Sequence, residues 1–265
     1  MTDTASAARY KVTTVGFGSL AVDWTTQLHS REPGQLIESP VWGAVIEGGG
    51  LRILVDTGIR DPAMVSQNMA PCTQSAGQAP AGVLDVLGWR CSDIDVVINT
   101  HLHFDHCGHN AAFPNARFVV SKTEWAWALD PAADQANLYA PREWLLPPLD
   151  ESRYSLVDDA DYRVADGITT FPTPGHSPGH LSVLVDTDEG RLCVAGDAVA
   201  IPENFTQRTP VGLVTSLEQA TASIEVIRTR ADRLLMAHDP RLTAFMASGY
   251  PAVPGDKTTL RPCTC

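Results

Sequence analysis

The stretch H-L-H-F-D-H at residues 101–106 places three histidines and an aspartate within six consecutive positions. It follows the run D-V-V-I-N of residues 95–99, whose adjacent apolar side chains predict a buried strand. In an extended backbone, side chains two positions apart point the same way. His101 and His103 can therefore converge on one metal ion where the strand ends.

Asp105 and His106 come two and three residues after His103, where the chain must bend, so they can bind a second ion beside the first. Imidazole together with carboxylate suits zinc, iron, cobalt or manganese, whereas calcium and magnesium prefer oxygen alone. One histidine in a loop is usually only polar and solvated, but four ligand-type residues in six positions favour a metal site. Zinc is the expected metal, with manganese, iron and cobalt as alternatives.

Three further segments carry metal-ligand side chains, and each follows an apolar, strand-like run. They are T-P-G-H-S-P-G-H at residues 173–180, G-D-A at residues 196–198 and H-D at residues 238–239. Ligand-type residues therefore recur where predicted strands end.

Together, the H-x-H-x-D-H run, the G-H-x-x-G-H run, the lone aspartate and the late histidine resemble the metallo-β-lactamase superfamily, from about Val41 to His238. The resemblance implies an α/β fold, an αββα sandwich of two mixed β-sheets flanked by helices. It also implies two metal ions, with His101, His103 and His176 on one, Asp105, His106 and His238 on the other, and Asp197 bridging them.

The catalytic residues implied by this resemblance are Asp105 and Asp197. Two adjacent cations can lower the pKa of a bound water from near 16 toward about 7, and Asp105 can orient the resulting hydroxide or accept its proton. The pattern is most similar to the N-acyl-homoserine lactonase branch, which implies hydrolysis of a lactone or similar small cyclic ester by a metal-bridging hydroxide. Many of those lactonases have a tyrosine three residues after the bridging aspartate, where this chain has Ala200.

Two residues beside the predicted ligands are expected to support them through hydrogen bonds. Asp56 ends an apolar strand, and His180 follows His176 by four positions. The alternative for Asp56 is a turn aspartate. His180 is expected to be a supporting or structural histidine, and the alternative is a metal ligand. The sequence leaves open whether His109 approaches the pocket or faces solvent, and it favours packing over metal binding for Cys107.

Apolar side chains in two segments are candidates for a substrate pocket or a dimer interface. The segments are residues 124–149 and a long loop expected at residues 21–40. The residues expected at the pocket are Trp24, Phe104, Trp125, Trp127, Trp144 and Ala200.

Other functions stay open at this level. The same site could hydrolyse an amide, a thioester or a phosphoester, could use iron in an oxidoreductase, or could bind metal without catalysis. A formal net charge of −12 disfavours nucleic acid as a partner, because phosphate binding depends on clustered Lys and Arg. The expected partner is a neutral or apolar small molecule, and a homodimer is compatible with the sequence.

The 265 residues are expected to form one domain, with flexible tails at residues 1–9 and 255–265 and a helical and loop insertion at residues 122–160. No signal peptide or membrane span is expected, so the protein is expected to be cytoplasmic and not to bind membranes. The six cysteines are scattered and predict reduced thiols, with Cys263 and Cys265 in the C-terminal tail.

Hydrophobic periodicity predicts strands mixed with helices. The predicted strands are residues 12–20, 41–47, 51–56, 96–99, 118–121, 168–171, 181–186, 191–195 and 234–237. The predicted helices are residues 81–87, 122–129 and 216–229. In the last helix, Thr215 and Glu218 are expected to form a capping box, and Leu217, Ala220, Ile224 and Ile227 to share the buried face.

Overall fold

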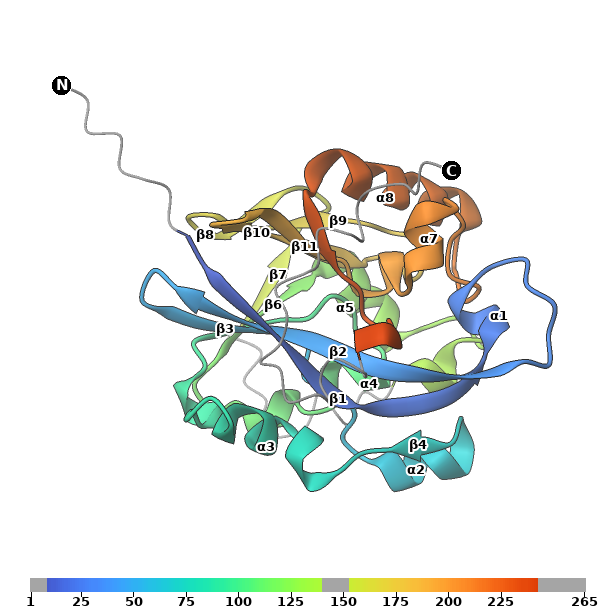
Figure 1. The fold of residues 1–265 in the computed structure, drawn as a ribbon, viewed down its shortest axis with the longest axis horizontal. Helices are drawn as coiled ribbons and strands as arrows, with labels where there is room; N and C mark the ends of the chain where they lie inside the picture. The colour runs from blue at the N-terminus through green and yellow to red at the C-terminus, as the bar shows by residue number, and fades with distance from the viewer. Residues whose placement is uncertain (1–8, 140–152, 243–265) are drawn as a thin grey trace.

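The computed structural model describes residues 9–139 and 153–242, in which two β-sheets lie face to face with helices on their outer faces (Figure 1). Within these residues the first sheet has the order β4 (Cys72–Thr73), β1 (Lys11–Asp23), β2 (Leu36–Gly48), β3 (Leu51–Val55), β5 (Val96–Ile98), β6 (Arg117–Ser121) and β7 (Tyr154–Val157). The second has the order β12 (Arg233–Leu235), β11 (Gly190–Val194), β10 (Leu181–Thr187), β9 (Ile168–Pro172) and β8 (Tyr162–Ala165). Both sheets combine parallel and antiparallel pairs, which confirms the predicted αββα sandwich.

The central strands are buried on both faces, because one face of each sheet packs on the other sheet and the opposite face packs on helices. Ile46 of β2 and Ile53 of β3 pack between the sheets against Val183 of β10. Their neighbours Val45 and Leu54 point to the opposite face, as the two-residue period of a strand requires. There they meet the helices α2 (Pro62–Asn68), α3 (Pro80–Asp85), α4 (Phe104–Cys107) and α5 (Lys122–Leu129).

The second sheet is covered on its outer face by α7 (Pro202–Thr206) and α8 (Leu217–Arg230). Ala220, Ile224 and Ile227 of α8 are buried, which confirms three of the four residues predicted for its inner face, but Leu217 is 42% exposed. The predicted capping box was wrong. Ser216 caps the helix by accepting a hydrogen bond from Gln219 N, while the Thr215 hydroxyl donates to the carbonyl of Gly175.

The predicted loop at residues 21–40 was also wrong for most of its length. β1 and β2 continue as an antiparallel pair to Asp23 and Leu36, beyond an irregularity between Gly16 and Ser19. The short helix α1 (Trp24–Gln27) follows β1 directly. Asp23, Glu38 and Pro40 interrupt the apolar pattern of this extension, so the sequence does not indicate its strands.

The other predicted elements are present with small shifts at their ends, and α5 has the predicted bounds. The sequence patterns missed β4, β7 and β8, which are short or lie at sheet edges. No helix in residues 9–139 and 153–242 is long and apolar enough to cross a membrane. The strands that carry the predicted ligand segments all end toward one region between the sheets, and this positions the site.

Candidate metal centre

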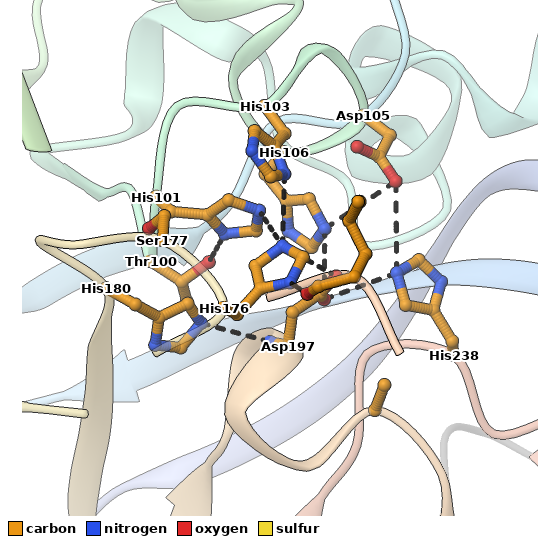
Figure 2. Close-up of polar contacts among 12 residues, drawn as sticks. Thr100, His101, His103, Asp105, His106, His176, Ser177, His180, Asp197 and His238 are labelled. Carbon is orange, nitrogen blue, oxygen red and sulfur yellow. Dashed lines mark hydrogen bonds and ion pairs between the residues drawn. The ribbon is translucent and has the colours of Figure 1, made fainter. Parts of the chain in front are cut away.

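All of the residues predicted as metal ligands meet at one edge of the sandwich, where their side chains point toward one another (Figure 2). They are His101, His103, Asp105, His106, His176, Asp197 and His238. The first four lie on the loop after β5 and the start of α4, and His176 lies between β9 and β10. Asp197 lies in the 3-10 helix η6 (Gly196–Val199) after β11, and His238 follows β12.

The first group consists of three buried histidines. His176 Nε2 lies 3.2 Å from His101 Nε2 and 3.0 Å from His103 Nδ1. The His176 Nδ1–H donates to the carbonyl of Leu213 at 2.8 Å, so the neutral ring carries a lone pair on Nε2. The Thr100 hydroxyl donates its hydrogen to the carboxylate of Asp56, so its oxygen accepts from His101 Nδ1 at 3.0 Å. His101 Nε2 therefore also carries a lone pair. Two facing lone pairs repel each other unless a cation lies between them.

The second group joins two histidines to Asp105. His106 Nε2 and His238 Nε2 lie 3.6 Å and 3.8 Å from Asp105 Oδ2. Their Nδ1 atoms are held from behind, because His106 donates to Asp56 and His238 donates to the carbonyl of Pro40, each at 2.8 Å. Both rings therefore turn Nε2 toward the same carboxylate oxygen.

Asp197 lies between the two groups, with one carboxylate oxygen toward each. Its Oδ2 is 3.3 Å from His176 Nε2, and its Oδ1 is 3.3 Å from His106 Nε2 and 3.2 Å from His238 Nε2. The side chain is buried, and Oδ1 has no hydrogen-bond partner in the described part of the chain. Buried polar atoms of this kind normally have a partner.

The donor set therefore fits two divalent metal ions. Imidazole nitrogens and carboxylate oxygens are the ligands of zinc and similar metals. Each histidine whose Nδ1 is fixed by a carboxylate or carbonyl has its ring orientation set in the manner typical of metal sites. A shared carboxylate also offsets the repulsion between two neighbouring cations.

The pKa values of the histidines differ between the groups. Burial and the neighbouring imidazoles hold the pKa of His101 and His103 well below their usual range, so these rings are neutral donors. Burial opposes a charge on His106, but the carboxylates of Asp105 and Asp197 raise its pKa well above its usual range. These two carboxylates therefore favour the protonated form of the His106 ring when no metal is bound.

Asp56 and His180 both contact the site without being among the ligand groups. Asp56 accepts hydrogen bonds at 2.8 Å from Thr100 N, the Thr100 hydroxyl and His106 Nδ1. His180 accepts the backbone N–H of Asp197 at 3.0 Å and donates through Nδ1 to the Thr173 hydroxyl at 2.8 Å. Burial lowers the pKa of His180 to about 3, so it stays a neutral acceptor.

Two further buried residues, for which the sequence predicted no role, also hold the loops of the site, namely Glu124 and Asn204. The Asn204 amide oxygen accepts from Ala200 N and Ile201 N at 3.1 Å and 2.8 Å, and its nitrogen donates to the carbonyl of Gln27 at 2.9 Å. Glu124 lies three residues after Ser121, a spacing typical of an ordinary helix cap. Because the spacing suggests a helix cap, the sequence does not indicate that Glu124 contacts the loops that carry the metal ligands.

A cavity of about 300 Å³ opens beside the metal-ligand groups. Its apolar lining comes from Leu20, Val22, Met69, Phe104, Leu138 and Leu213. Asp105 and Asp197 line it as well, so an apolar molecule in the cavity would lie against both carboxylates.

Of the residues expected at the substrate pocket, Phe104 lines this cavity. Trp125 lies instead with its ring 4.8 Å from that of Tyr154, and both Trp125 and Trp127 pack on the core cluster beneath α5. Trp24 packs under the guanidinium of Arg31, 4.7 Å from its ring. Trp144 lies outside the described residues. The described tryptophans on α5 and α1 thus pack against the core or against Arg31, and the sequence alone does not show which way these side chains face.

Three other residues of interest do not line the cavity. The Ala200 side chain is fully buried, and its carbonyl accepts from His238 N. Cys107 is buried in the core and donates to the carbonyl of Leu102, as expected for a packing residue. His109 is partly buried, and burial and the charge of Arg60 lower its pKa to about 4. Cys263 and Cys265 lie outside the described residues.

These placements predict different effects for two substitutions. Trp125→Ala should lower the free energy of unfolding by about 3 kcal/mol, because it leaves a gap in the core, and should leave KM nearly unchanged. Leu213→Ala should leave the free energy of unfolding nearly unchanged and raise KM roughly tenfold. It removes part of the cavity wall but keeps the backbone carbonyl that accepts from His176. Urea unfolding and steady-state kinetics on both variants measure this. A raised KM with unchanged stability for Trp125→Ala would contradict it.

The fold and the paired metal-ligand groups define the class of metal-dependent hydrolases built on an αββα sandwich. The sequence profile of the Metallo-beta-lactamase superfamily matches residues 37–238. The N-acyl homoserine lactonase of Bacillus cereus is 32% identical over 236 residues, which cover 84% of this chain and 90% of that protein. The chain therefore belongs to the metallo-beta-lactamase superfamily, and within it to the same family as these lactonases.

Solved structures agree with this assignment. The structure of a quorum-quenching N-acyl homoserine lactone hydrolase has a TM-score of 0.78 and 28% identity, covering 94% of this chain and 98% of that chain. Another, of an N-acyl homoserine lactone hydrolase with the product N-hexanoyl-L-homoserine bound at its catalytic metal centre, has a TM-score of 0.77 and 27% identity, covering 94% and 99%.

Proposed function

We propose that this protein hydrolyses the ester bond of lactones, and that N-acyl homoserine lactones are among its substrates. The observation that carries the proposal is the pair of metal-ligand groups, joined by Asp197, beside an apolar cavity. Relatives named as N-acyl homoserine lactonases support the choice of substrate. A similar solved structure holds the ring-opened product N-hexanoyl-L-homoserine at its metal centre.

We propose zinc as the metal, because borderline divalent ions match the mixed nitrogen and oxygen donors. His101, His103 and His176 would hold one ion, Asp105, His106 and His238 would hold the other, and Asp197 would contact both. When bound, such ions acidify water and polarise a carbonyl oxygen at neutral pH.

The protein's own groups supply binding and proton transfer in this proposal. Asp105 lines the cavity, and its carboxylate is placed to accept a proton from the attacking water and to return it to the leaving alkoxide. Leu20, Val22 and Leu213 would bind the apolar part of the substrate and exclude water from the reacting bond.

Two features bear on the substrate. Among the described residues lining the cavity there is no Lys or Arg, which favours neutral substrates over phosphoesters. The buried Ala200 offers no hydroxyl to the substrate carbonyl, and such a donor contributes about 2.7–4 kcal/mol in other enzymes. The absence of Lys and Arg from the described cavity lining therefore favours a neutral lactone as the substrate. We also propose a cytoplasmic location, since Cys72, Cys91 and Cys193 form no disulfide within the described part of the chain.

The test is acid release in a pH-stat from a series of N-acyl homoserine lactones and simple lactones, with and without chelator. A thioester, a phosphodiester and a β-lactam serve as comparison substrates. We expect chelator-sensitive hydrolysis of lactones to exceed that of every comparison substrate. Preference for the thioester or the phosphodiester, or no acid release from a metal-loaded sample, would overturn the proposal.

A further inference from the structure

Glu124, in the first turn of α5, is a fully buried carboxylate surrounded by four donors. Its Oε1 accepts from Leu102 N at 3.0 Å and from the Tyr139 hydroxyl at 3.2 Å. Its Oε2 accepts from the Ser177 hydroxyl at 2.6 Å and from Gly179 N at 3.2 Å. These donors come from three separate segments, so one side chain fastens three parts of the chain together.

Two of those segments carry the first ligand group. Leu102 lies between His101 and His103 in the chain, and Ser177 directly follows His176. The Glu124 carboxylate therefore bridges the two loops whose three imidazoles must converge. The third segment contributes the Tyr139 ring, which packs edge-on against His103 with ring centroids 4.7 Å apart.

The backbone is also arranged for this contact. A Cβ atom at Gly179 would lie 2.1 Å from Glu124 N, so only glycine lets the loop approach the first turn of α5. This close approach gives a structural reason for the second glycine of the G-H-S-P-G-H run, separate from any contact with metal.

The other buried carboxylate behind the site serves a different ligand. Among the ligand histidines, Asp56 hydrogen-bonds directly to His106, at 2.8 Å. It reaches His101 only through the Thr100 hydroxyl. Glu124 thus supports the first ligand group, whereas Asp56 contacts the second group directly and the first group only through Thr100.

We propose that Glu124 is a positioning residue that sets the affinity of the first ligand group for its metal ion, with Tyr139 and Ser177 as its partners. The inference rests on the ligand set proposed above. A carboxylate that accepts hydrogen bonds from both loops fixes the distance between them. Without it, the three imidazoles no longer converge on one metal position. Residues that orient metal ligands from behind typically change metal affinity about 10-fold to 100-fold when mutated.

The test is zinc binding by the purified protein, measured by elemental analysis after dialysis against buffered free zinc. The variants are Glu124→Gln, which keeps the shape of the side chain, and the matched control Asp56→Asn. We expect Glu124→Gln to weaken one of the two binding steps about 10-fold to 100-fold and to leave the other unchanged, and we expect Asp56→Asn to weaken mainly that other step. The double variant should weaken both steps, because the two carboxylates support different ions.

Three results would overturn the inference. In the first, Glu124→Gln weakens both zinc-binding steps equally and also lowers the unfolding temperature of the metal-free protein. That result is what a purely structural role of Glu124 requires. In the second, the double variant weakens only one step. In the third, Tyr139→Phe and Ser177→Ala both bind zinc with the affinity of the parent protein. If Glu124→Gln does not fold, these two milder variants test whether the contacts of Glu124 set the zinc affinity. Zinc binding is measured without a lactone, so a wrong substrate would not affect this result.

Discussion

Replacing Asp197 with asparagine is expected to lower kcat/KM for lactones at least about a thousandfold, which corresponds to about 4 kcal/mol of transition-state stabilisation. The carboxylate lies between the two ligand groups, with Oδ2 3.3 Å from His176 and Oδ1 3.2 Å from His238. Asparagine has nearly the same shape but no charge, and it turns an N–H₂ donor toward one of the groups. We therefore expect the fold to persist while the ability to hold two ions together is lost.

Kinetics, zinc content and thermal unfolding of the same sample check this prediction. Asp188→Asn is the matched control, since Asp188 is an exposed aspartate in the turn between β10 and β11. It should keep full activity and two zinc ions. Full activity of Asp197→Asn in a sample depleted of metal would contradict the proposed role of Asp197 and, with it, the metal-dependent mechanism.

The sequence predicts which side chains gather at the site because their positions follow from local rules. Each ligand segment comes directly after an apolar run, and the ends of neighbouring strands in a sandwich meet at one edge. Spacing within the 101–106 segment then separates the ligands into two groups. His101 and His103 lie together with His176, and Asp105 and His106 lie together with His238, as the spacing indicates, while His101, His106 and Asp197 form a third close group between them.

Asp56 and His180 were predicted to support the ligands, but the role of Glu124 was harder to predict because its partners are distant in the chain. Glu124 lies 22 residues from Leu102 and 55 from Gly179, and its position after Ser121 is equally typical of a helix cap. Thr215 looks like a cap and instead binds the loop before His176 through the Gly175 carbonyl. Local patterns cannot distinguish these alternatives, because both place a polar side chain at the start of a helix.

The substrate cavity was the least predictable feature. The tryptophans at positions 125 and 127 are apolar and lie near the metal segments in the chain, but which face of α5 carries them depends on how that helix packs on the first sheet. Val22 and Leu138 come from the two segments predicted as pocket candidates, whereas Leu20 and Leu213 carry no motif. A cavity of this kind is defined by packing, so the sequence indicates contributing segments but not which side chains face the cavity.

Removing the metals with a chelator is expected to reduce lactone hydrolysis to background, and acidification should remove one ion before the other. In the metal-free protein the carboxylates of Asp105 and Asp197 raise the pKa of His106, despite its burial, well above its usual range. His238 also has a raised pKa, because Asp197 outweighs the effect of burial on that ring. Metal must displace protons from this second group, so its affinity falls as the pH falls.

The first group should respond differently. Burial and neighbouring imidazoles lower the pKa of His101 and His103, so these rings carry no proton that competes with metal near neutral pH. Lowering the pH from about 8 to about 6 should therefore take bound zinc from two ions to one, with activity lost in the same step. Elemental analysis after dialysis at each pH, with activity measured on the same samples, tests this order. Simultaneous loss of both ions would show that the two groups bind metal as one cooperative unit, contrary to the difference in their pKa values.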